Sequence, residues 1–148
     1  MNLAHLAHLA RRFVRSLSRR PPPDADEEWA RSFLSPWERD LWNRFGYPDR
    51  RHAIEVARRF TARRPAATRD EVAGALLHDI GKIESRLGTF GRVAATVVGA
   101  RTDRFRLYHA HEMIGVQILR RAGSSPVTIE LVQRQGSAAE DLAAADDI

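Results

Sequence analysis

The sequence predicts an all-helical protein, and three observations lead to this prediction. Apolar residues recur at helical spacing along most of the chain, and no segment shows the strict alternation of a half-buried strand. Two capping boxes, Ser35 to Glu38 and Thr68 to Glu71, mark helix starts. Prolines and glycines separate the periodic segments. With 148 residues, 43% of them hydrophobic and 29% charged, the chain has the size and composition of one globular domain.

The first 20 residues predict a basic amphipathic helix. Leucines and Phe13 lie on roughly one face, whereas residues 1–20 carry five arginines and no acidic side chain. The three prolines at 21–23 end this helix and form a stiff linker, so we expect residues 1–23 to be a separate segment and residues 24–148 to be the domain. The helix could contact an anionic membrane surface, but packing against the domain or a partner is the simpler interpretation, because its alanines and histidines provide little apolar surface for binding to a membrane.

Caps and helix breakers delimit three helices in the next part of the chain, which we expect over residues 24–34, 36–45 and 49–64. Asp24 is placed to cap the first of them. The second begins at the Ser35 capping box, has a proline at its first position and is closed by Gly46. The third stops before Pro65.

The second capping box, at Thr68, opens a helix that we expect to end at Gly81. Further helices are expected over residues 92–99, 105–122 and 126–135, and from residue 138 onward. Gly123 stops the helix over 105–122, and Ser125 caps the one that follows. The segment 92–99 has the weakest helical pattern because it is rich in β-branched residues.

The helix that Thr68 opens ends in the stretch ALLHDIGK, residues 75–82. Residues 72–77 are apolar on every side, which predicts a helix buried in the middle of the domain. His78 and Asp79 therefore place two titratable groups at the end of a buried helix. An ionised carboxylate removed from water needs compensation, which a divalent cation would provide. The alternative is that Asp79 accepts backbone donors and His78 packs as an ordinary core histidine.

Other histidines and carboxylates occupy comparable positions on their own helices. His52 and His111 each share a helical face with apolar residues, and Asp146 follows a small apolar face on the last helix. Each has an ordinary structural interpretation when taken alone. Together, two imidazoles and two carboxylates from three helices suit a divalent ion with open positions for water and substrate. These four candidate ligands are His52, His78, Asp79 and Asp146.

This ordered set resembles a known family. His52, then HDIGK at 78–82, HEMIG at 111–115 and ADD at 145–147 are similar to the motifs of the HD-domain superfamily of metal-dependent phosphohydrolases. The resemblance covers about residues 35–148, and LSPWERDLW and LGTFGR are similar to segments of small actinobacterial members. It implies a compact HD-domain helical bundle that binds one or two divalent metals, with His52, His78, Asp79 and Asp146 as ligands.

The chain departs from the family pattern just before its last helix. Many two-metal members have two adjacent histidines there, whereas this chain has Gln135 and Gly136. The resemblance therefore implies a single-metal site, with His111 beside it or facing the substrate. Two histidines, two aspartates and water suit Mn, Fe, Co, Ni, Mg or Zn, so the sequence leaves the identity of the metal open.

The function we expect is hydrolysis of a phosphate ester in a small phosphorylated substrate, a nucleotide being one candidate. Asp79 could accept a proton from the attacking water, and Lys82, the only lysine of the chain, is placed to reach a phosphate. His111 or Glu112 could act as general acid. The alternative function is a catalytically degenerate HD module that binds metal or nucleotide and regulates a partner through the basic N-terminal helix.

Composition argues against several other classes of protein. There is no cysteine, which excludes disulfides and thiolate metal sites, and no stretch is apolar enough to cross a membrane, so we expect a cytoplasmic protein. The net charge of +5 lies in residues 1–20, and the rest of the chain carries equal numbers of basic and acidic side chains. Nucleic-acid binding is therefore disfavoured; such a binder would show steeply salt-dependent affinity that is lost on deleting residues 1–20.

Overall fold

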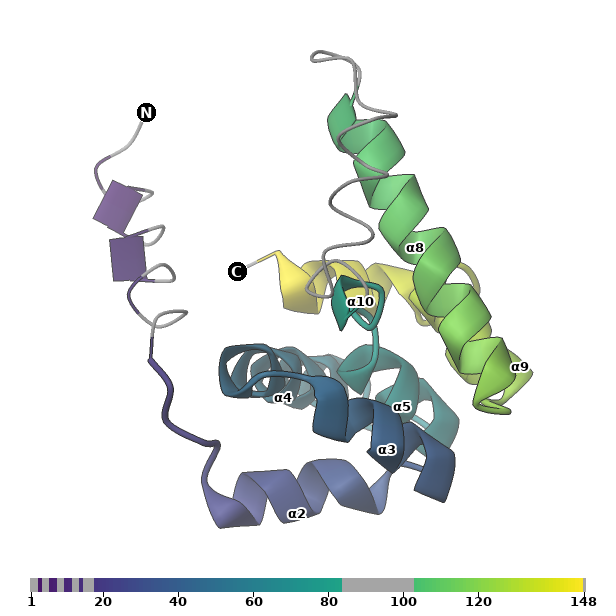
Figure 1. Ribbon diagram of the computed structural model, residues 1–148, viewed down its shortest axis with the longest axis horizontal. Helices are drawn as coiled ribbons and strands as arrows, with labels where there is room; N and C mark the ends of the chain where they lie inside the picture. The colour runs from purple at the N-terminus through teal and green to yellow at the C-terminus, as the bar shows by residue number, and fades with distance from the viewer. Residues whose placement is uncertain are drawn as a thin grey trace.

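The computed structural model describes residues 18–83 and 103–147, a few isolated positions before residue 18, and the side chains of the second range from residue 112 onward. Within these residues the regular structure is entirely helical (Figure 1), which confirms the all-helical prediction. The helices are α2 (Asp24–Ser32), α3 (Pro36–Arg44), α4 (Tyr47–Arg63), α5 (Arg69–Leu76), α8 (Asp103–Arg121), α9 (Pro126–Val132) and α10 (Ala139–Asp146). The helix expected over residues 92–99 lies outside the described residues, as do most positions of the expected N-terminal helix.

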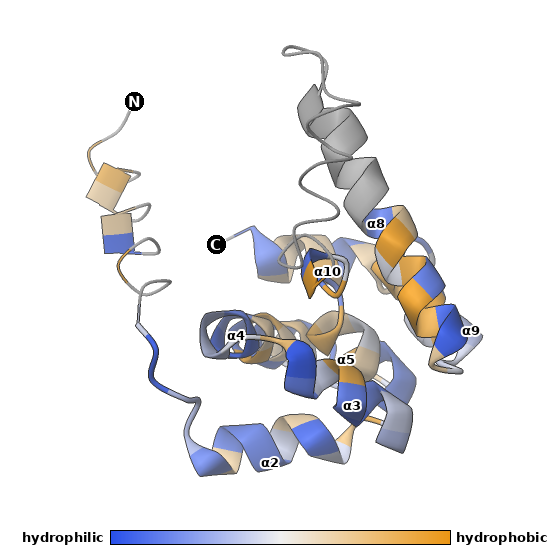
Figure 2. Cartoon of the chain, viewed as in Figure 1, coloured by the Kyte–Doolittle hydropathy of each residue, from blue (hydrophilic) through white to orange (hydrophobic). Residues whose placement is uncertain are grey.

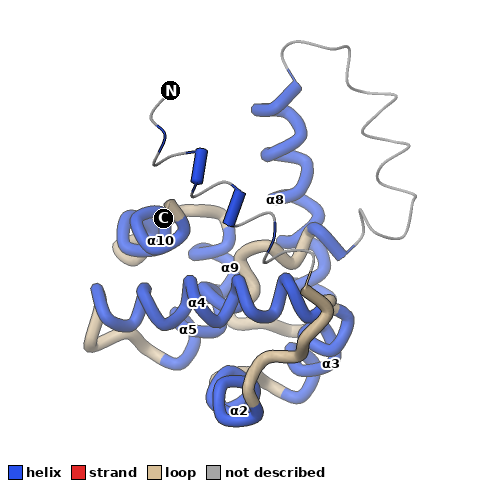
Figure 3. The backbone as a smooth tube through the Cα atoms, turned by 90° about the vertical axis from the view of Figure 1, so that its left-hand side faces the viewer, coloured by secondary structure: helices blue, strands red, loops and turns tan. Residues whose placement is uncertain are grey.

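Helices α4 and α5 form the centre of the molecule. Helix α4 packs against both α5 and α10, and α5 packs in turn against α9. The long helix α8 contacts α9, and α2 contacts α4 on the side of the molecule away from α10 (Figures 1 and 3). Helices far apart in the sequence, α4 and α9, thus both pack against α5.

One arginine joins the three helices α4, α5 and α10. The Arg64 guanidinium donates to both carboxylate oxygens of Glu71, at 3.1 and 3.0 Å, and lies 3.5 Å from the Asp141 carboxylate. Arg64 directly follows α4, whereas Glu71 and Asp141 lie in the first turns of α5 and α10. Helix α4 therefore runs antiparallel to α5 and α10, so its first turns lie near the ends of the other two.

The core consists of large apolar side chains from every described helix except α2. Those without solvent contact include Trp42, Phe60, Leu76, Leu119, Leu131 and Leu142. The predicted burial of residues 72–77 is confirmed, because all of them are buried. Figure 2 shows this pattern, with hydrophobic residues along α5 and the described part of α8 and a largely hydrophilic α2.

The sequence located most helix starts correctly. Both capping boxes are present: Glu38 accepts from the backbone N–H of Ser35, Glu71 from that of Thr68, and each hydroxyl accepts in return. Ser125 caps α9 as expected, since its side chain accepts from the Thr128 backbone N–H.

Two expected caps are wrong. Asp24 does not cap α2, because it is already helical and Pro23 occupies the capping position. Gly46 does not close α3, which ends at Arg44; it is instead the N-cap of α4 and has extended backbone angles. A proline at the second position of α4 fixes the helical φ there, so α4 begins at Tyr47 rather than at residue 49.

Two expected helix ends are also wrong. Helix α5 ends at Leu76 rather than at Gly81, and residues 77–81 form successive turns with backbone bonds from Ile80 to Leu77 and from Lys82 to Asp79, both 3.0 Å. Helix α9 ends at Val132 rather than at residue 135. The His-Asp doublet therefore lies in a turn beyond a helix, where its side chains are not restricted to a helical face.

The segment before α2 is attached to the domain at its C-terminal end. The Arg51 guanidinium on α4 donates to the backbone carbonyls of Ser18 and Arg20. Among the positions described before residue 18, Leu3, Leu6 and Val14 are exposed. No helix in the described part of the chain combines the length and apolar character that a membrane span needs.

Candidate metal centre

His52 reaches the site from the second turn of α4. It lies one and two turns before Val56 and Phe60, which have no solvent contact, so the helix face that carries His52 is packed onto the core as predicted. The imidazole itself is partly exposed at the edge of this face. Its Nε2 atom lies 3.3 Å from Oδ1 of Asp146.

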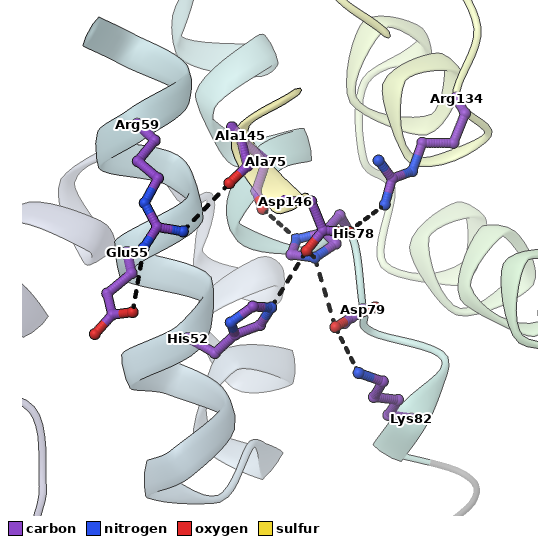
Figure 4. Close-up of polar contacts among 10 residues, drawn as sticks. All are labelled: His52, Glu55, Arg59, Ala75, His78, Asp79, Lys82, Arg134, Ala145 and Asp146. Atoms are coloured by element: carbon purple, nitrogen blue, oxygen red, sulfur yellow. Dashed lines mark hydrogen bonds and ion pairs between the residues drawn. The ribbon is translucent and has the colours of Figure 1, made fainter. Parts of the chain in front are cut away.

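His78 reaches the site from the turn that follows α5 (Figure 4). Its Nδ1 atom lies 2.7 Å from the Ala75 carbonyl oxygen, which is one of the last carbonyls of α5 and has no partner within the helix. The carbonyl can only accept, so Nδ1 carries a proton and Nε2 is the atom directed at the site. The side chain is fully buried, and Nε2 has no hydrogen-bond partner of good geometry.

Asp146, the last residue of α10, completes the cluster. Its Oδ1 atom lies 3.3 Å from Nε2 of His52 and 3.4 Å from Nε2 of His78, and its Oδ2 atom accepts from the Arg134 guanidinium at 2.8 Å. The buried side chains of Leu142 and Ala145 hold this end of the helix on the core. Asp147 is exposed, as expected.

The pKa values of the cluster reflect its burial and its mixture of charges. Burial alone would raise the pKa of Asp146, but the imidazoles of His52 and His78 and the Arg134 guanidinium outweigh it and hold this pKa well below its ordinary range. For His78, burial lowers the pKa, yet the carboxylates of Asp146 and Asp79 raise it above its ordinary value. The cluster therefore attracts a positive charge to the position that Nε2 of His78 faces.

Asp79 borders the cluster. Its Oδ2 atom lies 3.5 Å from Nε2 of His78 and 2.7 Å from Nζ of Lys82, whose side chain is 49% exposed. Burial would raise the pKa of Asp79, but the charges of His78 and Lys82 lower it below its ordinary value. Among the residues that the structure describes, His52, His78 and Asp146 alone offer ligand atoms that all lie within 4.8 Å of one another, so three of the four predicted ligands converge and Asp79 lies next to them.

His111 lies on α8, and its side chain is outside the described residues. One turn later, α8 crosses the doublet segment at Gly115. A Cβ atom at Gly115 would lie 3.1 Å from Ile80 Cγ2 and 3.4 Å from the Gly81 backbone nitrogen, so a side chain here would require the neighbouring chain to shift by a few tenths of an ångström. Helix α8 is therefore packed against the chain that carries His78 and Asp79.

A hollow of about 360 Å³ lies between α8 and the connection from α9 to α10. The residues that line it are Glu112, Met113, Val116, Gln117, Arg120, Gln133 and Gln135. Gln135, one of the two residues at the positions of the family's additional histidines, thus faces this hollow. Gly136 has a φ of 83°, a backbone conformation that favours glycine.

The distances from Asp146 to the two imidazoles are compatible with ligation of one divalent cation. Two ligand atoms at about 2.1 Å from one ion are separated by about 3.0 to 3.4 Å for octahedral or tetrahedral angles. The separations of 3.3 and 3.4 Å between the imidazole nitrogens and Oδ1 of Asp146 agree with these values. A fully buried imidazole nitrogen without a hydrogen-bond partner also calls for a ligand, because burying an unpaired polar atom is unfavourable.

Fold and site together define an all-helical protein with a partly buried cluster of two histidines and one aspartate. No protein-family model, curated protein or solved structure matches the chain. The resemblance to HD-domain proteins therefore stays a prediction that rests on the residues themselves.

Sequence reasoning missed Arg134, which contacts Asp146. Nothing in the sequence distinguishes this arginine, because all but one of the 24 basic residues are arginines. The one signal is its position, because Arg134 lies in residues 133–137, where the chain departs from the HD-domain pattern that it otherwise resembles.

Proposed function

We propose that the protein is a metal-dependent phosphohydrolase of the HD-domain kind, with one divalent ion held by His52, His78 and Asp146. The observation that carries this proposal is the buried Nε2 of His78, which makes no hydrogen bond of good geometry and is directed at a carboxylate that a second imidazole also faces. An arrangement with purely structural roles would be expected to pair this nitrogen. Asp79 is the fourth candidate ligand, as the resemblance implies.

The residues around the cluster suit a phosphate substrate. When bound, a divalent ion supplies Lewis-acid activation of water and of a phosphoryl oxygen. Lys82, half exposed at the rim beside Asp79, can bind a phosphate oxygen that solvent can reach. Asp79 is ionised because its pKa is lowered, so it can accept a proton from water or orient that water. His111 and Glu112 stay the two candidates for the general acid.

A single ion is the stoichiometry that we propose. In the described part of the chain, one group of histidines and carboxylates has converging ligand atoms. Gln135 is exposed and faces the hollow beside α8, so its amide is available to the non-phosphate part of a substrate.

Elemental analysis of the protein, purified without added metal, tests the metal site. We expect about one divalent ion per chain, lost in His52→Ala and Asp146→Ala and retained in Asp147→Ala, which removes the adjacent exposed carboxylate. Equal metal content in all of these proteins would mean that the cluster is not the site.

Turnover tests the enzymatic part of the proposal. The chelated and reconstituted protein is assayed on nucleotides, phosphomonoesters and phosphodiesters, and we expect metal-dependent release of product that Asp79→Ala and Lys82→Met reduce. Stoichiometric metal without turnover on any phosphate ester would refute the enzymatic assignment and favour a metal-binding regulatory module.

A further inference from the structure

Arg134 occupies an unusual backbone position. Its φ is 57°, and it is the one residue other than glycine with a positive φ in the described part of the chain. It directly follows the C-cap of α9: its N–H donates to the Leu131 carbonyl at 2.9 Å, and the N–H of Gln135 donates to the Glu130 carbonyl at 3.0 Å. This pair of bonds is the Schellman motif, in which the left-handed residue is usually glycine.

The same chain provides a direct comparison at the end of α8. There the N–H of Gly123 donates to the Arg120 carbonyl at 3.1 Å, and the N–H of Ser124 donates to the Leu119 carbonyl at 3.0 Å. Gly123 has a φ of 72°. The two helix ends thus have the same geometry, with glycine at one and a strained arginine at the other. Such strain is often found where a side chain has a functional role.

The side chain of Arg134 engages one oxygen of the candidate metal ligand. Its Nη2 atom donates to Oδ2 of Asp146 at 2.8 Å, and 22% and 27% of the two side chains are exposed. Oδ1 of the same carboxylate is left facing His52 and His78. Asp146 is the last residue of its helix, and helix ends fray, so an unrestrained side chain there would have many orientations.

We infer that Arg134 is a positioning residue, which fixes the Asp146 carboxylate so that Oδ1 alone is presented to the metal. This inference rests on the proposed metal site. The left-handed backbone of Arg134 ends α9. Its guanidinium then binds Oδ2 of Asp146, the oxygen that does not face His52 and His78. Partners that orient metal ligands in this way typically contribute 10- to 100-fold in metal affinity.

Substitution of Arg134 by glycine separates this role from a role in folding. R134G removes the guanidinium but relieves the backbone strain, so we expect the denaturation midpoint of the chelated protein to be unchanged or raised. The affinity for Co²⁺, measured by calorimetry, should fall 10- to 100-fold, and the visible spectrum of bound Co²⁺ should change because the carboxylate is reoriented. Unchanged or tighter Co²⁺ binding, or an unchanged spectrum, would overturn the inference.

Gly123→Ala is the matched control at the other helix end. It introduces strain into the same motif at the end of α8, which contains none of the cluster residues His52, His78 and Asp146. It should therefore lower the denaturation midpoint and leave the Co²⁺ affinity unchanged. Asp146→Ala distinguishes failure of the inference from failure of the proposed function. Wild-type Co²⁺ binding that Asp146→Ala does not weaken refutes the metal site and the inference together. Binding that Asp146→Ala abolishes and R134G retains in full refutes the inference alone.

Discussion

Metal binding at this cluster should release a proton from His78. The Nδ1 proton of this residue is held by the Ala75 carbonyl at 2.7 Å, so any second proton resides on Nε2, the atom that faces Asp146. Burial lowers the pKa of His78 but the two carboxylates raise it above its ordinary value of 6.5, so the metal-free protein keeps the Nε2 proton to a higher pH than an ordinary histidine does. A metal ion can bind Nε2 only after this proton has left.

The magnitude follows from this competition. Below the pKa of His78, each ion bound displaces about one proton from this residue, so affinity falls about tenfold, or about 1.4 kcal/mol, for each unit by which the pH is lowered. Above that pKa the contribution of His78 disappears. Asp146 and Asp79 add nothing near neutral pH, because both carboxyl groups have lowered pKa values and are already ionised.

Calorimetry in buffers of different ionisation enthalpy measures the number of protons released per ion between pH 5.5 and 8. Nitrogen-15 spectra of the histidine rings with and without Zn²⁺ identify the atom that loses its proton. Asp147→Asn changes the charge next to Asp146 without touching the cluster and should leave the profile unaltered. Binding that releases no proton at pH 6, or a His78 ring that loses the Nδ1 proton instead, would refute the reasoning.

The same shift sets the pH dependence of the metal-free fold. A raised pKa in the folded state stabilises the protein below the unfolded-state value of about 6.5, and this stabilisation is lost as the pH rises through the folded-state pKa. The increase in melting temperature on adding metal should therefore become larger as the pH rises through the folded-state pKa of His78.

Three further predictions concern ligation, packing and acid stability. Asp146→Asn should weaken metal binding in calorimetry at least 100-fold, whereas equal affinity in Asp146→Asn and Asp147→Asn would contradict the assignment of this ligand. Gly115→Val should lower the free energy of unfolding by about 1 to 3 kcal/mol in urea titrations, because its side chain would collide with the chain after α5; an unchanged midpoint would show that α8 is not packed there. Burial raises the pKa of Glu71, but its hydrogen bonds to Arg64 outweigh burial and lower this pKa below its ordinary value of 4.5. The stabilisation that this contact gives is therefore present above pH 4.5 and is lost as the pH falls through the folded-state pKa. Glu71→Gln should flatten that acid transition, and a profile as steep as that of wild type would argue against the contact.

The starts of helices were predictable from the sequence and several of their ends were not. A capping box such as Thr68 to Glu71 is local, because four consecutive residues contain both partners. The end of α5 at Leu76 depends instead on tertiary structure. Residues 77–81 leave the helix as turns that pack against α8, where a Cβ on Gly115 would lie 3.1 Å from Ile80 Cγ2. The end of α9 was missed because arginine stands at the position where glycine would have marked it.

The candidate ligands were predictable because each lies at a fixed phase of its own helix or at its end. His52 and Asp146 were placed by their spacing from buried apolar residues, and the structure brings both next to His78. The orientation of the Asp146 carboxylate depends on Arg134, which follows α9 and contacts the end of α10, and helical spacing does not predict this contact. The close approach at Gly115 was likewise hidden, because a glycine within a helix has several possible explanations.

The bonds of Arg64 to Glu71 and Asp141 have a consequence for how the site handles ions. They join α4, α5 and α10 at the ends opposite to those that carry His52, His78 and Asp146. The apolar core and the contacts of Arg64 already hold the three helices together. Removal of the metal should therefore leave a folded chain, unlike a zinc finger, which unfolds when its metal is removed. One ion can then be exchanged for another without refolding, so in a cell the occupant would be decided by supply as much as by affinity.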